Sequence, residues 1–310
     1  MEKKTNKKRV IVTGGAGFIG AHLTRELCKK GYQVFVVDNL VSGKKESVDR
    51  RAELHVVDIG NLDLLKKTFE VIGNIDYVFH LACRPRVQFS IDFPDQTNET
   101  NITGTLNVLI ASRDSKVKRV VYSASSSAYG DQKTMPLVET MQPNPKSPYG
   151  LQKYVSELYT RMFSVIYGLE TVSLRYFNVY GPDQDPKGGY AQAIPKFIDQ
   201  IKNGELVTIT GDGKQTRDFT HVKDIVAANM LAMDHPKVGK GETINIGAGK
   251  NVSMNYIAEL LGGKVSYIPA RLEPRDTKAD STLAKKLLGW EPKISIEEGL
   301  KELKKLNGIR

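Results

Sequence analysis

Cysteine is scarce in this sequence, and long apolar runs are missing. The 310 residues include two cysteines, Cys28 and Cys83, and neither stands in a metal-binding spacing such as Cys-x-x-Cys. We therefore predict no metal site, and we expect both thiols to be small buried side chains. No stretch approaches the roughly 18 apolar residues that cross a bilayer. The polar start leads directly into an apolar run and does not resemble a signal peptide, so we expect a cytoplasmic protein with no membrane segment.

The sequence also lacks the motifs of nucleic-acid-binding proteins, although it carries excess positive charge. Its formal net charge is +10, which alone invites a nucleic-acid interpretation. The lysines and arginines, however, are spread along the chain, with a local excess only at the two ends. No helix-turn-helix, zinc finger or RNA-binding aromatic motif accompanies them. We predict that small phosphate-bearing molecules, and not nucleic acid, account for the charge.

The most informative stretch is rich in glycine and lies near the start of the chain. Residues 10–12 form a β-branched run typical of a buried strand. Gly14, Gly17 and Gly20 follow and lead into an amphipathic segment that ends near Lys29. This order of strand, glycine turn and helix suits a dinucleotide, because its diphosphate must reach the helix N-terminus with no side chain in between. We predict that Gly14 permits the turn, Gly17 the approach of the diphosphate and Gly20 close packing of helix and strand.

An acidic residue follows the second apolar run. Residues 34–37 are apolar, and Asp38 comes 18 residues after Gly20. In dinucleotide-binding folds an acidic residue near this position hydrogen-bonds the 2′-hydroxyl of a ribose. Its charge would repel a 2′-phosphate, so the sequence favours NAD over NADP. The alternative is that Asp38 only caps a turn.

Apolar strands alternate with helical patterns along the first half of the chain. The expected strands are 10–12, 34–37, 54–57, 77–81, 120–123, 169–174, 206–209, 243–246 and 265–268. The expected helices end near 29 or span 62–71, 100–112, 149–167, 194–202, 224–233, 254–261 and 281–288. This alternation predicts an α/β fold, a Rossmann-like doubly wound parallel sheet with a smaller C-terminal α/β substrate lobe. We expect an NAD-binding domain over 1–174, rejoined by about 220–248, and a discontinuous substrate lobe within 175–310.

A second set of residues has the composition of a proton-transfer site. Tyr149 and Lys153 are four residues apart in a predicted helix and therefore share a face. A serine-rich strand end, which includes Ser125, precedes them. Tyrosine is a poor base at neutral pH, because its ordinary pKa is near 10. A neighbouring ammonium and the positive ring of oxidised NAD would favour the phenolate, and a serine hydroxyl would hydrogen-bond the reacting oxygen.

These motifs together resemble the extended short-chain dehydrogenase/reductase family, in particular its NAD-dependent nucleotide-sugar epimerases and dehydratases. The resemblance covers nearly the whole chain. Its motifs lie at residues 14–20, 38–40, 58, 80–82, 101, 125–130, 149 with 153, 175–182, 211–213 and 217–219.

The resemblance implies roles for individual residues. The catalytic residues would be Ser125, Tyr149 and Lys153. The cofactor would be held by Gly14, Gly17, Phe18, Ile19, Gly20, Asp38, Asn39, Asp58, Ile59, Leu81, Ala82, Asn101, Ser123, Tyr149, Lys153 and Tyr176. The substrate would be bound by Arg86, Ser127, Asn178, Tyr190, Val207, Arg217, Arg271, Arg275 and Thr277. Which of Arg271 and Arg275 binds the second phosphate stays open.

The residues after Ser125 bear on the reaction. Family members that eliminate water carry Asp-Glu at this point, and related decarboxylases carry Glu, whereas this chain has Ser126 and Ser127. Elimination is therefore disfavoured, and 4-epimerisation of a UDP-sugar through a 4-keto intermediate is expected, with NAD regenerated in each turnover. The resemblance is greatest to UDP-GlcNAc/UDP-glucose 4-epimerases. Thr277 stands where enzymes strict for UDP-galactose tend to carry tyrosine, so it leaves room for an N-acetyl group.

Alternatives to this reaction remain at the sequence level. Arg86 departs from the small residues that the family usually carries there, and it could bind the carboxylate of UDP-glucuronate or point to solvent. Another NAD-dependent nucleotide-sugar reaction or a non-catalytic NAD-binding regulator is also possible; the intact Ser125, Tyr149 and Lys153 argue against the regulator. The resemblance further implies a homodimer, in which the helices at 100–112 and 149–167 pair with their copies.

Overall fold

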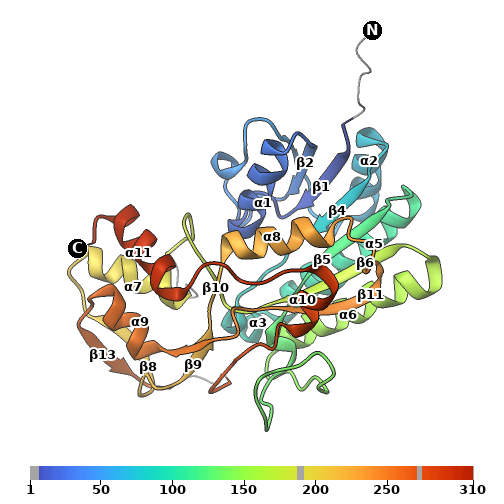
Figure 1. Cartoon of the computed structure of the whole chain (residues 1–310). Helices are drawn as coiled ribbons and strands as arrows, with labels where there is room; N and C mark the ends of the chain where they lie inside the picture. The colour runs from blue at the N-terminus through green and yellow to red at the C-terminus, as the bar shows by residue number, and fades with distance from the viewer. Residues whose placement is uncertain (1–6, 187–191, 271–273, 310) are drawn as a thin grey trace.

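The computed structural model describes residues 7–186, 192–270 and 274–309 (Figure 1). Seven parallel strands form its central sheet, in the order β11-β6-β5-β4-β1-β2-β3. They are β1 (Arg9–Thr13), β2 (Gln33–Asp38), β3 (Glu53–Val56), β4 (Tyr77–His80), β5 (Arg119–Ser125), β6 (Glu170–Tyr176) and β11 (Lys240–Ile246). The predicted α/β Rossmann-like sheet is confirmed. The strand order reverses at β1, which lies between β2 and β4, and ligands of such sheets bind at the carboxyl edge beside this point.

Helices cover both faces of the sheet, which is why most side chains of β1, β2, β4, β5 and β6 are buried. The helices of one face are α1 (Phe18–Lys29), α8 (Val222–Ala232) and α10 (Thr282–Leu288), and those of the other are α2 (Leu62–Ile72), α5 (Gly104–Asp114) and α6 (Pro148–Tyr167). Val10 and Val12 face the first group, and Ile11 faces the second. Side chains alternate along a strand, so each face of β1 needs its own apolar cover.

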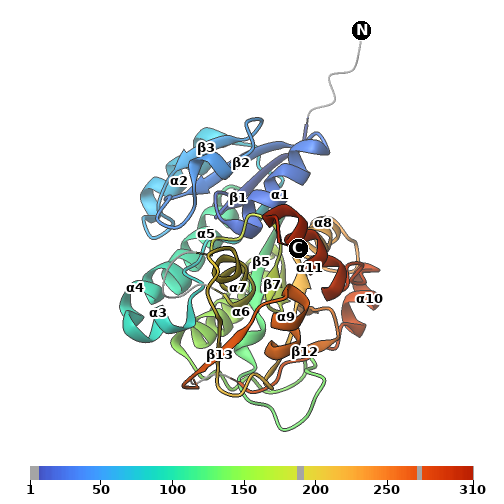
Figure 2. The same cartoon turned by 90° about the vertical axis from the view of Figure 1, so that its left-hand side faces the viewer.

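The C-terminal lobe has a core of its own. It contains α7 (Ala193–Lys202), β8 (Val207–Thr210), α9 (Met254–Leu261), β13 (Val265–Ile268) and α11 (Ile296–Asn307). Figures 1 and 2 show α7, α9 and α11 grouped beside the sheet and lying in front of it when viewed from that side. Three short strand pairs complete the structure: β7 (Val179–Tyr180) with β10 (Thr220–His221), β9 (Thr216–Asp218) with β12 (Asn251–Ser253), and β8 with β13.

Several elements differ from the sequence prediction. The strand expected at 54–57 is β3, one residue earlier, and Val56 is 60% exposed because β3 is the edge strand. Two short helices, α3 (Val87–Asp92) and α4 (Pro94–Asn98), precede the helix expected at 100–112, which opens with a π-helical turn over Glu99–Thr103. The prediction also lacked α11, although Ser295 and Glu298 form a capping box at its start. No helix among the described ranges is long and apolar enough to cross a membrane.

Candidate active site

The glycine turn between β1 and α1 has the geometry of a dinucleotide site. Gly14 has φ +71°, and a Cβ there would lie 2.6 Å from the Ala82 nitrogen at the end of β4. A Cβ on Gly20 would lie 2.1 Å from the Gly14 oxygen, so this glycine packs against the turn itself and not, as predicted, against a strand. Gly17 is the N-cap of α1, without a side-chain cap, and the first turn holds no acidic residue. The positive helix end therefore stays open to a diphosphate.

Asp38, at the end of β2, already has two backbone partners. Its carboxylate accepts hydrogen bonds from the Ala16 nitrogen at 3.0 Å and from the Leu40 nitrogen at 2.8 Å. The bond to Ala16 holds the glycine turn in place. The bond to Leu40 caps the turn after β2, which is the alternative role given for Asp38 above. A carboxylate can accept about four hydrogen bonds, so these two contacts leave capacity for a ribose hydroxyl.

The ends of β2 and β3 meet next to Asp38. The Asn39 amide donates to Asp58 at 2.8 Å, and Asp58 also accepts from the Gly60 nitrogen. Ile59 is buried, and Asn107 of α5 donates to its carbonyl at 2.8 Å. The predicted adenine side of the site is therefore a small hydrogen-bonded unit at the carboxyl edge of the sheet.

Tyr149 and Lys153 lie on the first turns of α6, beside the end of β5. Ser147 caps this helix and Pro148 begins it. Both side chains are buried, 8% exposed for Tyr149 and 3% for Lys153, and the Lys153 ammonium donates to the Ser123 carbonyl at 2.6 Å. A buried ion pair, Arg175 of β6 with Glu157, attaches α6 to the sheet. The pairing of this tyrosine and lysine at one sheet edge follows the prediction.

Burial opposes ionisation of Tyr149 in the protein alone. It raises the pKa of the phenol to about 12, while Lys153 and a hydrogen bond from Ser125 lower this pKa. Cys83 raises it further, and this thiol is half-buried rather than fully buried as predicted. The influence of the lysine has the predicted direction but does not outweigh burial. The positive charge of an oxidised nicotinamide would act in the same direction as Lys153.

A chain of buried hydrogen bonds connects the glycine turn with Asn101. The Ala82 nitrogen donates to Thr13 Oγ1, which lies 2.7 Å from His80 Nδ1, and His80 Nε2 lies 2.9 Å from Thr105 Oγ1. Thr105 donates its own proton to the Asn101 carbonyl, so His80 must donate through Nε2 and accept at Nδ1. Burial lowers the pKa of His80 to about 3 and keeps it neutral.

Asn101 supports the site through its neighbours. Its Oδ1 accepts from the Arg84 nitrogen at 2.8 Å, and its amide donates to Gln152 and to the Arg84 carbonyl. Leu81, half-buried, directly precedes Ala82, and Tyr176 is buried at the end of β6 with its hydroxyl bonded to Asn229. Phe18 and Ile19 are half-buried at the start of α1. All predicted cofactor residues therefore lie along the carboxyl edge of the sheet or next to it.

On the substrate side, Asp218 brings the predicted residues together. This buried carboxylate accepts from the nitrogens of Ala248, Gly249 and Ala279, and burial still raises its pKa to about 6. Its backbone contacts both Asn178, which donates to the Asp218 carbonyl, and Thr277, whose hydroxyl lies 3.4 Å from the Asp218 nitrogen. Asp218 belongs to the motif at residues 217–219, but no role was predicted for it.

The remaining substrate residues differ in accessibility. Arg217 donates to the Arg275 carbonyl at 2.8 Å, and the Arg275 side chain is exposed, so these two arginines adjoin. Ser127 lies 3.1 Å from the Ser125 hydroxyl. Val207 is completely buried in the lobe core, and its role in binding the substrate stays a prediction. Tyr190 and Arg271 lie outside the described residues.

Ser90, a residue absent from the prediction, holds Tyr149 in place. Its hydroxyl accepts from the Tyr149 nitrogen at 3.0 Å, and its own nitrogen donates to the Arg86 carbonyl. The contact depends on α3 packing against α6, which no spacing in the sequence reveals. Among the described ranges, no group of three or more His, Cys, Asp or Glu side chains could hold a metal ion.

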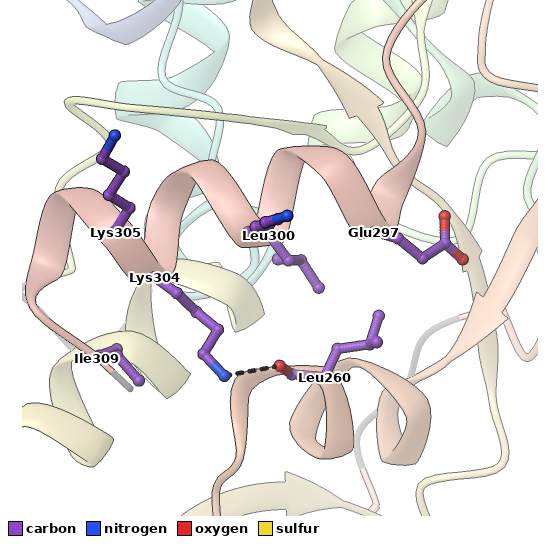
Figure 3. A pocket seen from close by; sticks show the side chains of 7 residues that line it. Leu260, Glu297, Leu300, Lys304, Lys305 and Ile309 are labelled. Atoms are coloured by element: carbon purple, nitrogen blue, oxygen red, sulfur yellow. Dashed lines mark hydrogen bonds between the residues drawn. The ribbon is translucent and has the colours of Figure 1, made fainter.

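A surface hollow in the C-terminal lobe lies apart from these residues. It measures about 490 Å³ between α9 and α11, and Lys304 closes part of it by donating to the Leu260 carbonyl (Figure 3). Its lining residues are Leu260, Glu297, Leu300, Lys301, Lys304, Lys305 and Ile309. None of them belongs to the predicted site.

Comparison with known proteins agrees with the fold described above. Residues 10–247 match the model of the NAD dependent epimerase/dehydratase family. A UDP-glucose 4-epimerase from Thermotoga maritima, solved with UDP-glucose, is 42% identical with a TM-score of 0.90, over 94% of this chain and 96% of that chain. A UDP-N-acetylglucosamine 4-epimerase from Methanobrevibacter ruminantium, solved with UDP-N-acetylmuramic acid, is 38% identical with a TM-score of 0.90, over 96% and 97%. A UDP-glucuronate 4-epimerase from Thermodesulfobacterium geofontis is 38% identical over 94% of this chain and 93% of its own length.

Proposed function

The chain belongs to the NAD-dependent epimerase/dehydratase family, and we propose that it is an NAD-dependent isomerase that inverts C4 of a UDP-sugar through a 4-keto intermediate. The sugars are UDP-glucose/UDP-galactose, UDP-GlcNAc/UDP-GalNAc or both pairs. The observation that carries this proposal is the placement of Ser125, Tyr149 and Lys153 together at the carboxyl edge, with Ser126 and Ser127 where eliminating enzymes carry acids. Relatives of similar length are 4-epimerases of these sugars.

Each catalytic residue has a defined task. Tyr149 takes the proton from the sugar O4. It returns the proton after the 4-keto sugar has rotated in the site. Lys153 holds its ammonium near the phenol and is fixed by the Ser123 carbonyl, while Ser125 hydrogen-bonds the reacting oxygen. The glycine turn and Asp38 would hold NAD, which would supply reversible hydride transfer at C4 of the sugar. Asn178, Arg217 and Arg275 bind the diphosphate region, and Asn101 positions the segment around Arg84.

A direct assay tests this function. The purified protein is incubated with UDP-galactose, UDP-GlcNAc or UDP-glucuronate without added NAD, and the products are separated by chromatography. We expect conversion to the C4 epimer, because the cofactor is regenerated and stays bound between turnovers. If no UDP-sugar is converted by protein that contains NAD, the epimerase proposal fails and a non-catalytic NAD-binding role replaces it.

Thr277 sets the space around the sugar in this proposal. The residue is 8% exposed, and its hydroxyl lies 3.4 Å from the Asn178 amide. We expect Thr277→Tyr to lower kcat/KM for UDP-GlcNAc about 10-fold or more relative to UDP-galactose, because the larger ring overfills the site. Thr277→Ser keeps the hydroxyl and should keep the ratio of the two sugars. An equal loss for both sugars in the tyrosine variant would argue against a role in sugar size.

We also propose a homodimer formed by α5 and α6. The α6 helix carries exposed apolar side chains at helical spacing, namely Leu151, Leu158, Met162, Val165 and Ile166. A monomer rarely leaves such a stripe open to water. We expect Met162→Glu to convert the dimer into a monomer in light scattering, because it places a charge in the interface. Leu306→Glu, at an even more exposed position on α11, should leave the mass unchanged.

Two further proposals concern organisation and location. We propose that residues 1–174 with about 220–248 form the NAD-binding domain and that the rest of 175–310 forms the substrate lobe. The pairing of β11 with β6 and the separate core of α7, α9 and α11 support this division. We place the protein in the cytoplasm, since Cys28 and Cys83 are both free thiols, as is usual in a reducing compartment.

A further inference from the structure

Arg86 is fixed close to the catalytic tyrosine by its backbone. It is the last residue before α3, and its carbonyl accepts from the nitrogen of Ser90 at 3.0 Å. The hydroxyl of the same Ser90 accepts from the nitrogen of Tyr149 at 3.0 Å. Two residues earlier, Arg84 is held at both backbone atoms by the Asn101 amide. The segment that carries Arg86 is therefore part of the rigid wall of the site.

Among the described residues, the guanidinium of Arg86 has no hydrogen-bonding or ion-pair partner. The side chain is half-buried, yet it makes no hydrogen bond or ion pair with any residue in the described part of the chain. Burial lowers its pKa, whereas Asp185, Cys83 and Tyr149 lie close enough to raise it electrostatically. Asp185 is already paired with Lys44 at 3.5 Å. A guanidinium offers five N–H donors, and removing them from water without acceptors is costly. An anionic ligand would supply these acceptors.

The position of Arg86 decides which part of the ligand it reaches. The diphosphate ligands proposed above, Asn178, Arg217 and Arg275, come from the segments around Asp218. Arg86 instead comes from the sheet edge that holds Tyr149, which must contact the sugar at O4. A planar guanidinium binds a carboxylate through two parallel hydrogen bonds. An acidic group on the sugar matches both the place and the geometry.

We propose that Arg86 is a specificity-determining residue that binds a carboxylate on the sugar, so that the protein acts on UDP-hexuronic acids as well as on neutral UDP-sugars. The inference rests on the proposed function, because it uses the placement of the sugar next to Tyr149. It adds a substrate class and assigns the residue that selects it. Thr277, which contacts Asn178 and Asp218, is the residue proposed above to leave room for the neutral sugars.

The test compares UDP-glucuronate with UDP-glucose in protein that contains NAD. Wild-type protein should convert both, and Arg86→Ala should lower the ratio of kcat/KM for acid over neutral sugar by about 10- to 100-fold. Arg86→Lys keeps the charge but not the paired donors. Its ratio of kcat/KM should therefore lie between those of the wild type and Arg86→Ala. Arg84→Ala is the matched control, since that guanidinium lies 5.5 Å from the centre of the Phe89 ring and should leave the ratio in place.

Binding measured by calorimetry separates this inference from the proposed function. Wild-type protein should bind UDP-glucuronate more tightly than Arg86→Ala protein does, with a smaller difference for UDP-glucose. The inference is overturned if the variant loses equal affinity for both sugars, or if Arg84→Ala changes the ratio as strongly. Absence of turnover with any UDP-sugar would refute the epimerase proposal alone, because the difference in binding would still report on Arg86.

Discussion

Replacing Tyr149 by phenylalanine is expected to lower kcat for UDP-galactose by about 10²- to 10⁴-fold, the usual contribution of a positioned acid–base group. The substitution removes only the hydroxyl. The ring keeps its buried place on α6, and the bond from the Tyr149 nitrogen to Ser90 belongs to the backbone. The fold should therefore persist, as checked by an unchanged circular dichroism spectrum and an unchanged amount of bound NAD.

The size of this effect follows from the ionisation of the phenol. In the protein alone burial places the pKa of Tyr149 at about 12, so at neutral pH the hydroxyl keeps its proton. Proton transfer from the sugar requires this pKa to fall, and Lys153 and Ser125 both act in that direction. Phenylalanine leaves these two residues with no group to act on.

A matched variant separates chemistry from packing. Tyr159→Phe removes a hydroxyl from the same helix, where the ring packs against the sheet core away from the site. It should retain wild-type activity. Undiminished turnover by Tyr149→Phe would show that another group carries the proton and would refute the assigned role.

The glycine turn and the Tyr149–Lys153 pair were predictable from the sequence because both depend on local spacing. A strand, a turn and a helix follow one another within twenty residues, and a four-residue interval on a helix fixes a shared face. The sheet was predictable for a similar reason, since strands buried on both faces read as continuous apolar runs. The residue roles in the substrate lobe came from resemblance to a family and not from spacing.

The features that the sequence did not predict depend on contacts between distant segments. The complete burial of Val207 results from packing within the core of the C-terminal lobe. Cys83 is only half-buried because it lies outside the sheet, three residues after the end of β4. Ser90 of α3 contacts Tyr149 of α6, which is 59 residues later in the sequence. None of these outcomes is encoded in a local pattern, so a sequence alone could not supply them.

The second large effect concerns Gly20 and Gly17, at which an added methyl group is expected to have different consequences. In Gly20→Ala the new Cβ would lie 2.1 Å from the Gly14 oxygen and 2.8 Å from the Gly15 Cα. The turn must shift, so we expect a loss of about 1–3 kcal/mol in the free energy of unfolding together with a loss of bound NAD. In Gly17→Ala the nearest atom, the Gly14 oxygen, is 3.3 Å away, so stability should change by about 1 kcal/mol or less.

Gly17→Ala should nevertheless lose NAD, because its methyl group occupies the approach of the diphosphate to the open N-terminus of α1. Urea unfolding of NAD-free protein measures stability, and chromatography of nucleotide released from denatured protein measures NAD per chain. A stable Gly17→Ala protein with little NAD would locate the diphosphate at this turn. Full retention of NAD in that variant would place the diphosphate elsewhere, and the turn would then serve only to join β1 to α1. If only Gly20→Ala lost NAD, the conclusion would be the same, because the distorted turn of that variant would explain the loss.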